Sequence, residues 1–332
     1  MNRKIAILFG ISALLLASCS RTTDESQNAH ASEFLLIGTS SSSIATAYRQ
    51  WLAQLAVREN INADLRVMGS GESIHNLVSG KVDFSGTDAH PDSDDFEKAR
   101  RGMLAFPVTA RSIAVAYNHP GCSLKITRNQ LVAIFLGKIT DFAELGCSKQ
   151  LIQVMHRQSA SGTTAAFTET LSAFSTAWRN GPGHGLQVKW PVGTSVNGSE
   201  EMIQRLKQTR GGLGYVEAAL VDKPLATASL ESRSGGFLQP TSIDTARALD
   251  TIQLDQRLLG HNPDPEVGYP IMSLAWVLVP NKLDADKAAA LRKSINYMLS
   301  QPGQDDAERL GYIPLTDAIL MKSRQQVEKI QP

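Results

Sequence analysis

The sequence predicts an α/β fold arranged as two lobes. Short apolar runs typical of buried strands alternate along the chain with segments whose apolar residues recur at helical spacing. Two longer apolar stretches, 106–117 and 269–279, each pass through a proline and are interpreted as crossovers. If the chain crosses between lobes at both places, its two ends form one lobe and its middle forms the other.

The elements follow from local periodicity. We expect strands at 34–37, 65–68, 81–84, 152–155 and 273–279. Apolar residues at helical spacing predict three helices, and Gly80 is well placed to end the second of them. The residues that mark these helices are Ile44, Ala47, Tyr48, Trp51 and Leu55, then Ile74, Leu77 and Val78, then Phe167, Thr170, Leu171 and Phe174.

Composition excludes several classes of protein. The 332 residues are 42% hydrophobic, which is ample for a buried core in one large domain or two smaller ones. The net charge of +1 gives no overall basic field for binding nucleic acid. Three cysteines are too few for a disulfide-rich scaffold, and no internal apolar stretch is long enough to span a membrane.

The N-terminus has the layout of a secretory signal. Arg3 and Lys4 precede a short, almost wholly apolar segment at 5–17. That segment ends in Leu16-Ala17-Ser18-Cys19, which resembles the lipobox of bacterial lipoproteins.

The lipobox resemblance implies that residues 1–18 are removed and that Cys19 carries a lipid. The polar stretch 19–32 then serves as a flexible tether. We therefore expect an exported protein, periplasmic or at the cell surface, anchored to a bacterial membrane only by its lipid. The alternative is an ordinary signal peptide that is cut beyond a chance cysteine.

Export also bears on the other two cysteines. Cys122 and Cys147 would lie in an oxidising compartment, where they can form a disulfide. The alternative is a pair of buried free thiols.

Four segments share one pattern, in which a strand is followed by a turn of small and hydroxyl residues and then by a helix. They lie at 38–43, 69–73, 157–163 and 197–199. A helix N-terminus presents unpaired N–H groups and partial positive charge, so such turns suit an anion. Arg157 adds a planar set of donors that fits phosphate or carboxylate. Helix capping explains each turn on its own better than anion binding does, and only the repetition of the pattern favours an anion site.

Asp88 ends the segment 82–88 and places a carboxylate near these turns. A carboxylate accepts a hydrogen bond from a protonated oxyanion such as hydrogen phosphate and repels sulfate. Alternative roles are helix capping, a turn, or a metal site over 88–92. His156 is a weak candidate for a base acting on Ser161. The sequence contains no G-x-S-x-G elbow, no H-E-x-x-H motif and no Walker A loop.

Several segments, in this order and spacing, resemble the PstS family, the phosphate-binding proteins of bacterial phosphate ABC transporters. The resemblance covers most of the mature chain. Its motifs are Val67-Met68-Gly69-Ser70-Gly71, Val82-Asp83-Phe84-Ser85-Gly86-Thr87-Asp88, Phe135-Leu136-Gly137-Lys138-Ile139, Arg157 to Thr163, Lys189-Trp190-Pro191-Val192-Gly193 and Gly212-Leu213-Gly214-Tyr215-Val216-Glu217.

This resemblance implies a two-lobed periplasmic binding protein of type II. Each lobe would hold a mixed sheet flanked by helices, and a two-strand hinge would join the lobes. The first lobe would comprise 33–108 and 271–332, and the second 109–270.

The resemblance also implies a set of phosphate ligands. Two positions depart from the family pattern: a serine run at 40–43 replaces Thr-Phe-Pro, and Ser159 replaces an acid. The second change removes a carboxylate near Arg157, which leaves the arginine more electropositive or less firmly oriented. The implied ligands are Ser42, Ser43, Ser70, Asp88, Arg157, Ser161, Gly162 and Thr163.

The expected function is capture of inorganic phosphate between the lobes and its delivery to an ABC transporter permease. The resemblance implies a monomer that is not an enzyme, with no cofactor, no metal and no nucleic-acid partner. One alternative is an exported phosphatase-type hydrolase that uses Ser161 or Thr163 as nucleophile. Another is a sensor or scaffold that keeps the fold without transport.

Overall fold

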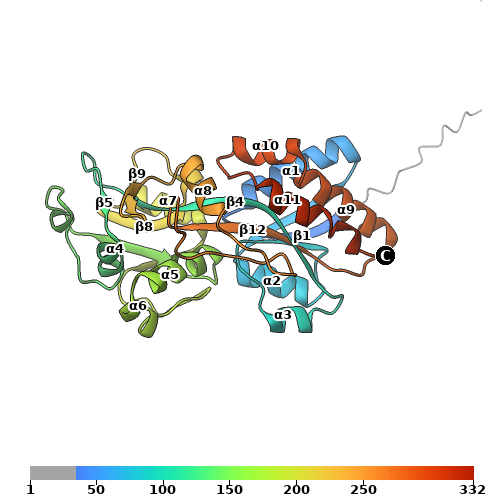
Figure 1. Cartoon of the computed structure of the whole chain (residues 1–332), viewed down its shortest axis with the longest axis horizontal. Coiled ribbons are helices and arrows are strands. Elements are labelled where there is room, and N and C mark those ends of the chain that lie inside the picture. Colours follow the sequence, from blue (N-terminus) through green and yellow to red (C-terminus); the bar gives the residue numbers. More distant parts are fainter. Residues whose placement is uncertain (1–34) are drawn as a thin grey trace, which may run out of the picture. The chain divides into compact units, whose positions relative to one another are not determined.

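A computed structural model describes residues 35–332, and its framework is a nine-stranded mixed sheet (Figure 1). The predicted signal peptide at 1–18, the tether at 19–32 and the lipidation site Cys19 lie outside the described residues. The strands of the sheet are β1 (Leu35–Ser41), β2 (Asn62–Met68), β3 (Phe84–Thr87), β4 (Leu104–Tyr117), β6 (Gln153–Arg157), β7 (Thr194–Val196), β8 (Gly212–Glu217), β9 (Ala226–Thr227) and β12 (Met272–Val279).

The long strand β4 holds the sheet together. Its first part pairs antiparallel with β12 as far as Ser112, and from Ile113 onward it pairs antiparallel with β8. Parallel pairing appears on both sides of this junction, with β1 between β2 and β3, and β6 between β7 and β8. The sheet order is β2-β1-β3-β12-β4-β8-β6-β7, and β9 pairs with β4.

Helices flank the sheet along its whole length. The C-terminal helices gather beside the first helix at one end of Figure 1. They are α1 (Ala45–Glu59), α2 (Ser70–Val78), α3 (Ser93–Lys98), α4 (Arg128–Phe135), α5 (Gly162–Phe174), α6 (Thr176–Asn180), α7 (Gly198–Gln208), α8 (Ser242–Leu249), α9 (Ala285–Met298), α10 (Gln301–Arg309) and α11 (Asp317–Arg324). Three short 3₁₀ helices, η1 (Phe142–Leu145), η2 (Ala218–Leu220) and η3 (Val327–Lys329), and a small sheet of β5 (Lys125–Ile126), β10 (Ser229–Glu231) and β11 (Phe237–Leu238) complete the described fold.

Two large apolar clusters divide the core between two lobes. The first includes Trp51 and Trp276, and the second includes Phe167 and Tyr215. We call the parts built around them the first and the second lobe. β4 contributes to both clusters. The expected fold class, an α/β two-lobed protein with mixed sheets, is confirmed.

The expected lobe limits, 33–108 with 271–332 and 109–270, stay a proposal. The change of β4 from one cluster to the other, between Ala110 and Ile113, supports them. Within 109–270, however, four residues after the start of α8 pack into the first cluster: Ala248, Leu249, Ile252 and Leu258.

Most expected elements are present, and one strand is displaced. The strand expected at 81–84 instead occupies Phe84–Thr87. Within this strand, the small residue Gly86 lies opposite Ser40 of β1. A Cβ on Gly86 would lie 2.6 Å from the ring of Tyr48, so only glycine lets α1 pack this closely on the strand.

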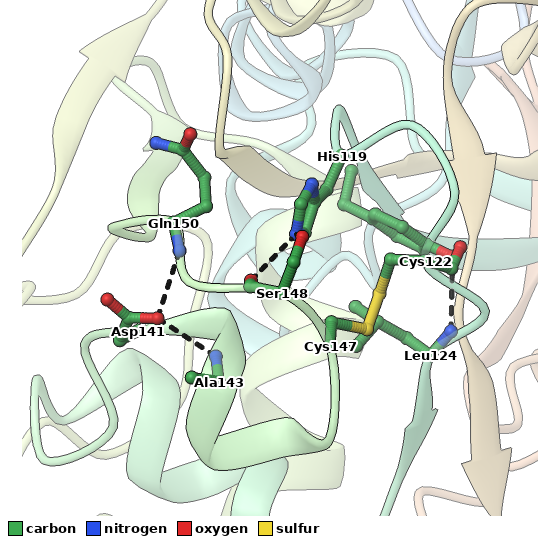
Figure 2. The surroundings of a disulfide bond; sticks show 9 residues. His119, Cys122, Leu124, Asp141, Ala143, Cys147, Ser148 and Gln150 are labelled. Atoms are coloured by element: carbon green, nitrogen blue, oxygen red, sulfur yellow. Dashed lines mark hydrogen bonds between the residues drawn. A yellow bond between two sulfur atoms is a disulfide. The ribbon is translucent and has the colours of Figure 1, made fainter.

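The predicted disulfide is confirmed. Cys122 follows β4 and Cys147 follows η1, and their Cα atoms are 5.5 Å apart (Figure 2). Beside the bridge, His119 Nε2 and the carbonyl oxygen of Ser148 are 3.0 Å apart, which joins the same two loops a second time. None of the helices within 35–332 is long and apolar enough to span a membrane.

Breaking this disulfide should destabilise the protein. The bridge closes a loop with a sequence separation of 25, and a loop of that size stabilises the folded chain by about 3 kcal/mol. The Cys122→Ala/Cys147→Ala double variant should therefore unfold at lower urea, and reductant should shift the unaltered protein but not the variant. Identical transitions for the unaltered protein with and without reductant would contradict this prediction.

Candidate functional site

The predicted turns converge where the two lobes meet. β1 leads into Ser42 and β3 into Asp88, and because these parallel neighbours end at the same sheet edge, both residues lie there. From the second lobe, β6 ends at Arg157 and α5 begins at Gly162. Hydrogen bonds between the lobes, described next, hold these segments together.

Asp88 is the centre of the first set of contacts. Ser70 Oγ, at the start of α2, donates to Asp88 Oδ1 at 2.6 Å and accepts from the backbone N–H of Gly162 at 2.9 Å. The side chains of Arg111 and Thr163 reach the other carboxylate oxygen, Asp88 Oδ2. This carboxylate is only 2% exposed, and donors from both lobes hold it.

A second carboxylate, Glu217 at the end of β8, completes a buried ionic cluster. Arg111 Nη1 donates to Glu217 Oε1 at 2.7 Å while Arg111 Nη2 contacts Asp88. The Thr163 hydroxyl lies 2.7 Å from Glu217 Oε1 and 3.2 Å from Asp88 Oδ2, so one proton is within reach of both carboxylates. We call Asp88, Arg111, Thr163 and Glu217 the ionic cluster.

The arginines govern the ionisation of Glu217. Burial alone would raise the pKa of this carboxyl, but the charges of Arg111 and Arg157 outweigh it and hold the pKa below its ordinary value. Glu217 is therefore a carboxylate at neutral pH.

Arg157 lies beside this cluster and is held by hydroxyls. Arg157 Nη2 donates to Ser42 Oγ at 3.2 Å, before α1, and Arg157 Nη1 donates to Ser199 Oγ at 3.3 Å, in the first turn of α7. Its Nε is buried and has no hydrogen-bond partner among the described residues. No carboxylate in 35–332 comes within 4.0 Å of Arg157. The family's acid is replaced by Ser159, and the hydroxyls of Ser42 and Ser199 orient the arginine instead.

Aromatic packing supports Arg157 from behind. Its backbone N–H donates to Tyr215 Oη at 3.1 Å, and the Tyr215 ring stacks on Phe167 at a centroid distance of 4.4 Å. His156 stacks on Trp190 at 5.0 Å. The histidine ring packs against this tryptophan, so His156 is a packing residue here and not a base for Ser161.

The two lobes touch through backbone at Gly162. A Cβ on this residue would lie 2.4 Å from the carbonyl carbon of Asp88, closer than real Cβ atoms approach. Glycine is therefore required for α5 to approach β3 this closely.

Two cavities adjoin these contacts. Asp88 and Ser273 help to line one of about 160 Å³, whereas Ser42 and Arg157 help to line another of about 250 Å³. Asp88 and Arg157 thus face different cavities. The contacts of Ser70, Gly162 and Thr163 link the two lobes.

Two predicted ligands have other partners. The Ser43 hydroxyl pairs with the Ser41 hydroxyl at 2.8 Å. The Ser161 side chain caps α5, and its N–H donates to the carbonyl of Leu186 at 2.9 Å. The other six form two bonded groups. Ser42 bonds to Arg157, and Ser70, Asp88, Gly162 and Thr163 bond among themselves.

Sequence reasoning did not place Arg111, Glu217 or Ser199 among the site residues. Arg111 gave a signal, because it is a lone charge within the apolar stretch 106–117. Glu217 ended a quoted motif, and Ser199 lay in the fourth turn, but neither position revealed its partner. Within 35–332, no group of three His, Cys, Asp or Glu residues is arranged to hold a metal ion.

Comparisons with known proteins place this chain in a family. A profile of the PBP superfamily domain matches residues 20–302. The phosphate-binding protein PstS of Xylella fastidiosa is 29% identical over 299 residues, covering 84% of this chain and 80% of that protein. Alkaline phosphatase L of Pseudomonas aeruginosa is 22% identical over 205 residues, covering 51% and 52% of the two chains.

A solved structure has the same fold. The phosphate-binding protein from Stenotrophomonas maltophilia superposes with a TM-score of 0.72 at 20% identity, covering 88% of this chain and 94% of that one. The family resemblance stated from the sequence motifs is confirmed.

Stability should depend on pH through Glu217. Because the folded-state pKa is depressed, this group stabilises the protein above its unfolded pKa of about 4.3, and the stabilisation is lost as pH falls through the folded pKa. The difference in unfolding free energy between the unaltered protein and Glu217→Gln should therefore be largest near neutral pH and shrink below about pH 4. Urea unfolding at several pH values measures it, with exposed Glu308→Gln as control. A difference independent of pH would refute the assignment.

Gly162→Ala should be destabilising because its Cβ meets backbone. Overpacking of this kind costs about 1–3 kcal/mol. Gly236→Ala is the matched control, since its Cβ would meet only Ser232 Oγ at 3.8 Å. Urea unfolding should separate the two variants, and equal stability would show that the lobes do not touch at Gly162.

Proposed function

Because this chain belongs to the PBP superfamily, we propose that it binds inorganic phosphate between its two lobes. One observation carries the proposal: a buried guanidinium, Arg157, is held by hydroxyls at the starts of two helices and keeps an unpartnered Nε among the described residues. Helix N-termini, hydroxyls and a guanidinium together suit a small oxyanion. The relative from Xylella fastidiosa is itself named a phosphate-binding protein.

The proposed ligands are the eight predicted residues, of which six lie in the two bonded groups described above. Asp88 and Arg157 line different cavities, so phosphate would contact both only after it takes the place of Ser70 Oγ at the Gly162 N–H. That exchange gives up a neutral hydrogen bond of about 1 kcal/mol for a charge-assisted one of about 1.5–3 kcal/mol, so it favours the anion. Ser43 and Ser161 would contribute after a local rearrangement, since other groups now hold their hydroxyls.

Asp88 would select a protonated anion. Asp88 Oδ1 accepts one hydrogen bond, from Ser70, and a carboxylate oxygen has capacity for a second. Hydrogen phosphate can donate that bond, whereas sulfate has no proton to donate near neutral pH. The carboxylate then favours the first anion and repels the second.

The cellular role is proposed from the N-terminal sequence and the family resemblance. We propose that the chain is exported, is anchored through a lipid on Cys19, and delivers phosphate as a monomer to the permease of an ABC transporter. Binding, and not turnover, would then be its activity, without a cofactor. The alternative role, a sensor or scaffold without transport, would also begin with the binding of phosphate.

A phosphatase-type hydrolase is the second candidate, and the similarity to alkaline phosphatase L favours it. Its nucleophile would be Ser161 or Thr163. The Thr163 hydroxyl bonds to Glu217, whose lowered pKa makes it a poor general base at neutral pH. The hydroxyl of Ser161 caps a helix. Binding therefore accounts for these contacts better than hydrolysis does.

Titration calorimetry tests the proposal. The unaltered protein should bind one phosphate per chain and bind sulfate much more weakly. Asp88→Asn should reduce the phosphate-to-sulfate preference by about 10–100-fold, because the amide can donate to a bare oxyanion and a charge-assisted bond is lost.

The surface variant Asp286→Asn is the matched control and should retain the preference. Absence of phosphate heat from the unaltered protein would refute the proposal, and an unchanged preference in Asp88→Asn would remove Asp88 from the site. Turnover of a chromogenic phosphate ester that disappears in Ser161→Ala would favour the hydrolase instead.

A further inference from the structure

Arg111 is the charged residue of β4, and the strand buries it between the lobes. Its side chain is only 2% exposed. The strand Leu104–Tyr117 is buried almost throughout, and its other residues are all uncharged. The desolvation of a guanidinium is costly, so a position of this kind needs partners of opposite charge. Its two partners come from different lobes.

The position of Arg111 on β4 explains this reach. β4 pairs with β12 up to Ser112 and with β8 from Ile113, so Arg111 stands at the junction between the two pairings. One terminal nitrogen contacts Asp88 beyond β3, and the other donates to Glu217 at the end of β8. A single side chain of β4 therefore bonds to both carboxylates.

We propose that Arg111 is the positioning residue that keeps Asp88 ionised and oriented, and thereby sets the preference for a protonated oxyanion. This inference rests on the proposed phosphate function. Arg111 acts through Asp88 and does not itself have to touch the ligand.

The physical reason is the closeness of two carboxylates. Asp88 and Glu217 share the hydroxyl of Thr163, at 3.2 and 2.7 Å. Without the guanidinium, two buried like charges this close favour uptake of a proton by one of them. A protonated Asp88 would donate a hydrogen bond to any oxyanion, so sulfate would no longer be rejected.

Other groups around Asp88 do not replace Arg111. Arg157 lies among the hydroxyls of Ser42 and Ser199. On the cavity side, burial lowers the pKa of His90 to about 4, so that this ring is neutral at the pH values of interest. The titratable and charged groups that face the ionic cluster are Arg157, Tyr312 and, across the cavity that Asp88 lines, His90, Glu169 and His261.

The test compares Arg111→Gln and Arg111→Lys with the unaltered protein. Phosphate and sulfate affinities are measured by calorimetry from pH 5 to pH 8. In Arg111→Gln, sulfate affinity should increase as the pH falls toward 5. At that pH it should exceed the affinity of the unaltered protein by about tenfold or more, because a rise of one unit in the pKa of Asp88 increases its protonated fraction about tenfold. Arg111→Lys keeps the charge and should restore most of the unaltered pH profile.

Arg128→Gln is the matched control. Arg128 also pairs with an acid, at 2.8 Å from Asp264, outside the ionic cluster. If Arg111→Gln does not fold, the double variant Arg111→Gln/Glu217→Gln removes the charge pair together. Its Asp88 stays buried without a cation but no longer lies near a second carboxylate, so acid-dependent sulfate binding should appear in a weaker form.

The outcomes are distinct. If Arg111→Gln, or the double variant, still prefers phosphate and its sulfate affinity follows the same pH profile as in the unaltered protein, this inference is overturned while the proposed function stands. Absence of phosphate binding by the unaltered protein overturns both. Loss of affinity for both anions to the same extent at every pH would show that Arg111 has only a structural role, and would also overturn the inference.

Discussion

The buried ion pairs of Arg111 with Asp88 and Glu217 are the constraint on which the rest of the site depends. Taking one guanidinium and two carboxylates out of water is favourable only when each retains partners, and removing one member of such a pair costs about 3–5 kcal/mol. β4 must therefore cross the molecule in a fixed register, and β3 and β8 must end where their acids reach it. The positions of Ser70 and Thr163 follow, because their hydroxyls bond to the same carboxylates.

Close backbone approach is the second requirement, and small residues meet it. Gly162 lies against the carbonyl of Asp88, where any side chain would push α5 away from β3. Gly86 of β3 leaves space for the ring of Tyr48 on α1. The two glycines act at different interfaces, the first between the lobes and the second inside the first lobe. Hydroxyl side chains then supply donors without adding bulk between the lobes.

Arg157 depends on a different kind of support. No carboxylate within 35–332 pairs with it, so Ser42, Ser199 and the hydrogen bond of its backbone to Tyr215 fix its position. The Tyr215 ring is stacked on Phe167 and cannot shift without disturbing the apolar cluster of the second lobe. A cation that is held by hydroxyls retains most of its charge for an anion, whereas a paired one would not. Replacement of the family's acid by Ser159 is thus compatible with an oriented arginine.

The sequence by itself determined the elements and the chemistry of the turns. Helical periodicity placed α1, the apolar run placed β12, and Asp88 and Arg157 were found because each follows a strand within a recognisable motif. Only the tertiary structure decided which of these groups bond to one another. Arg111 and Glu217 are 106 residues apart and meet because β4 pairs with β8, and neither periodicity nor local spacing carries that information. The same holds for Ser43 and Ser161, whose hydroxyls bond to neighbouring groups. It also holds for β3, which lies at Phe84–Thr87 and not at the expected 81–84.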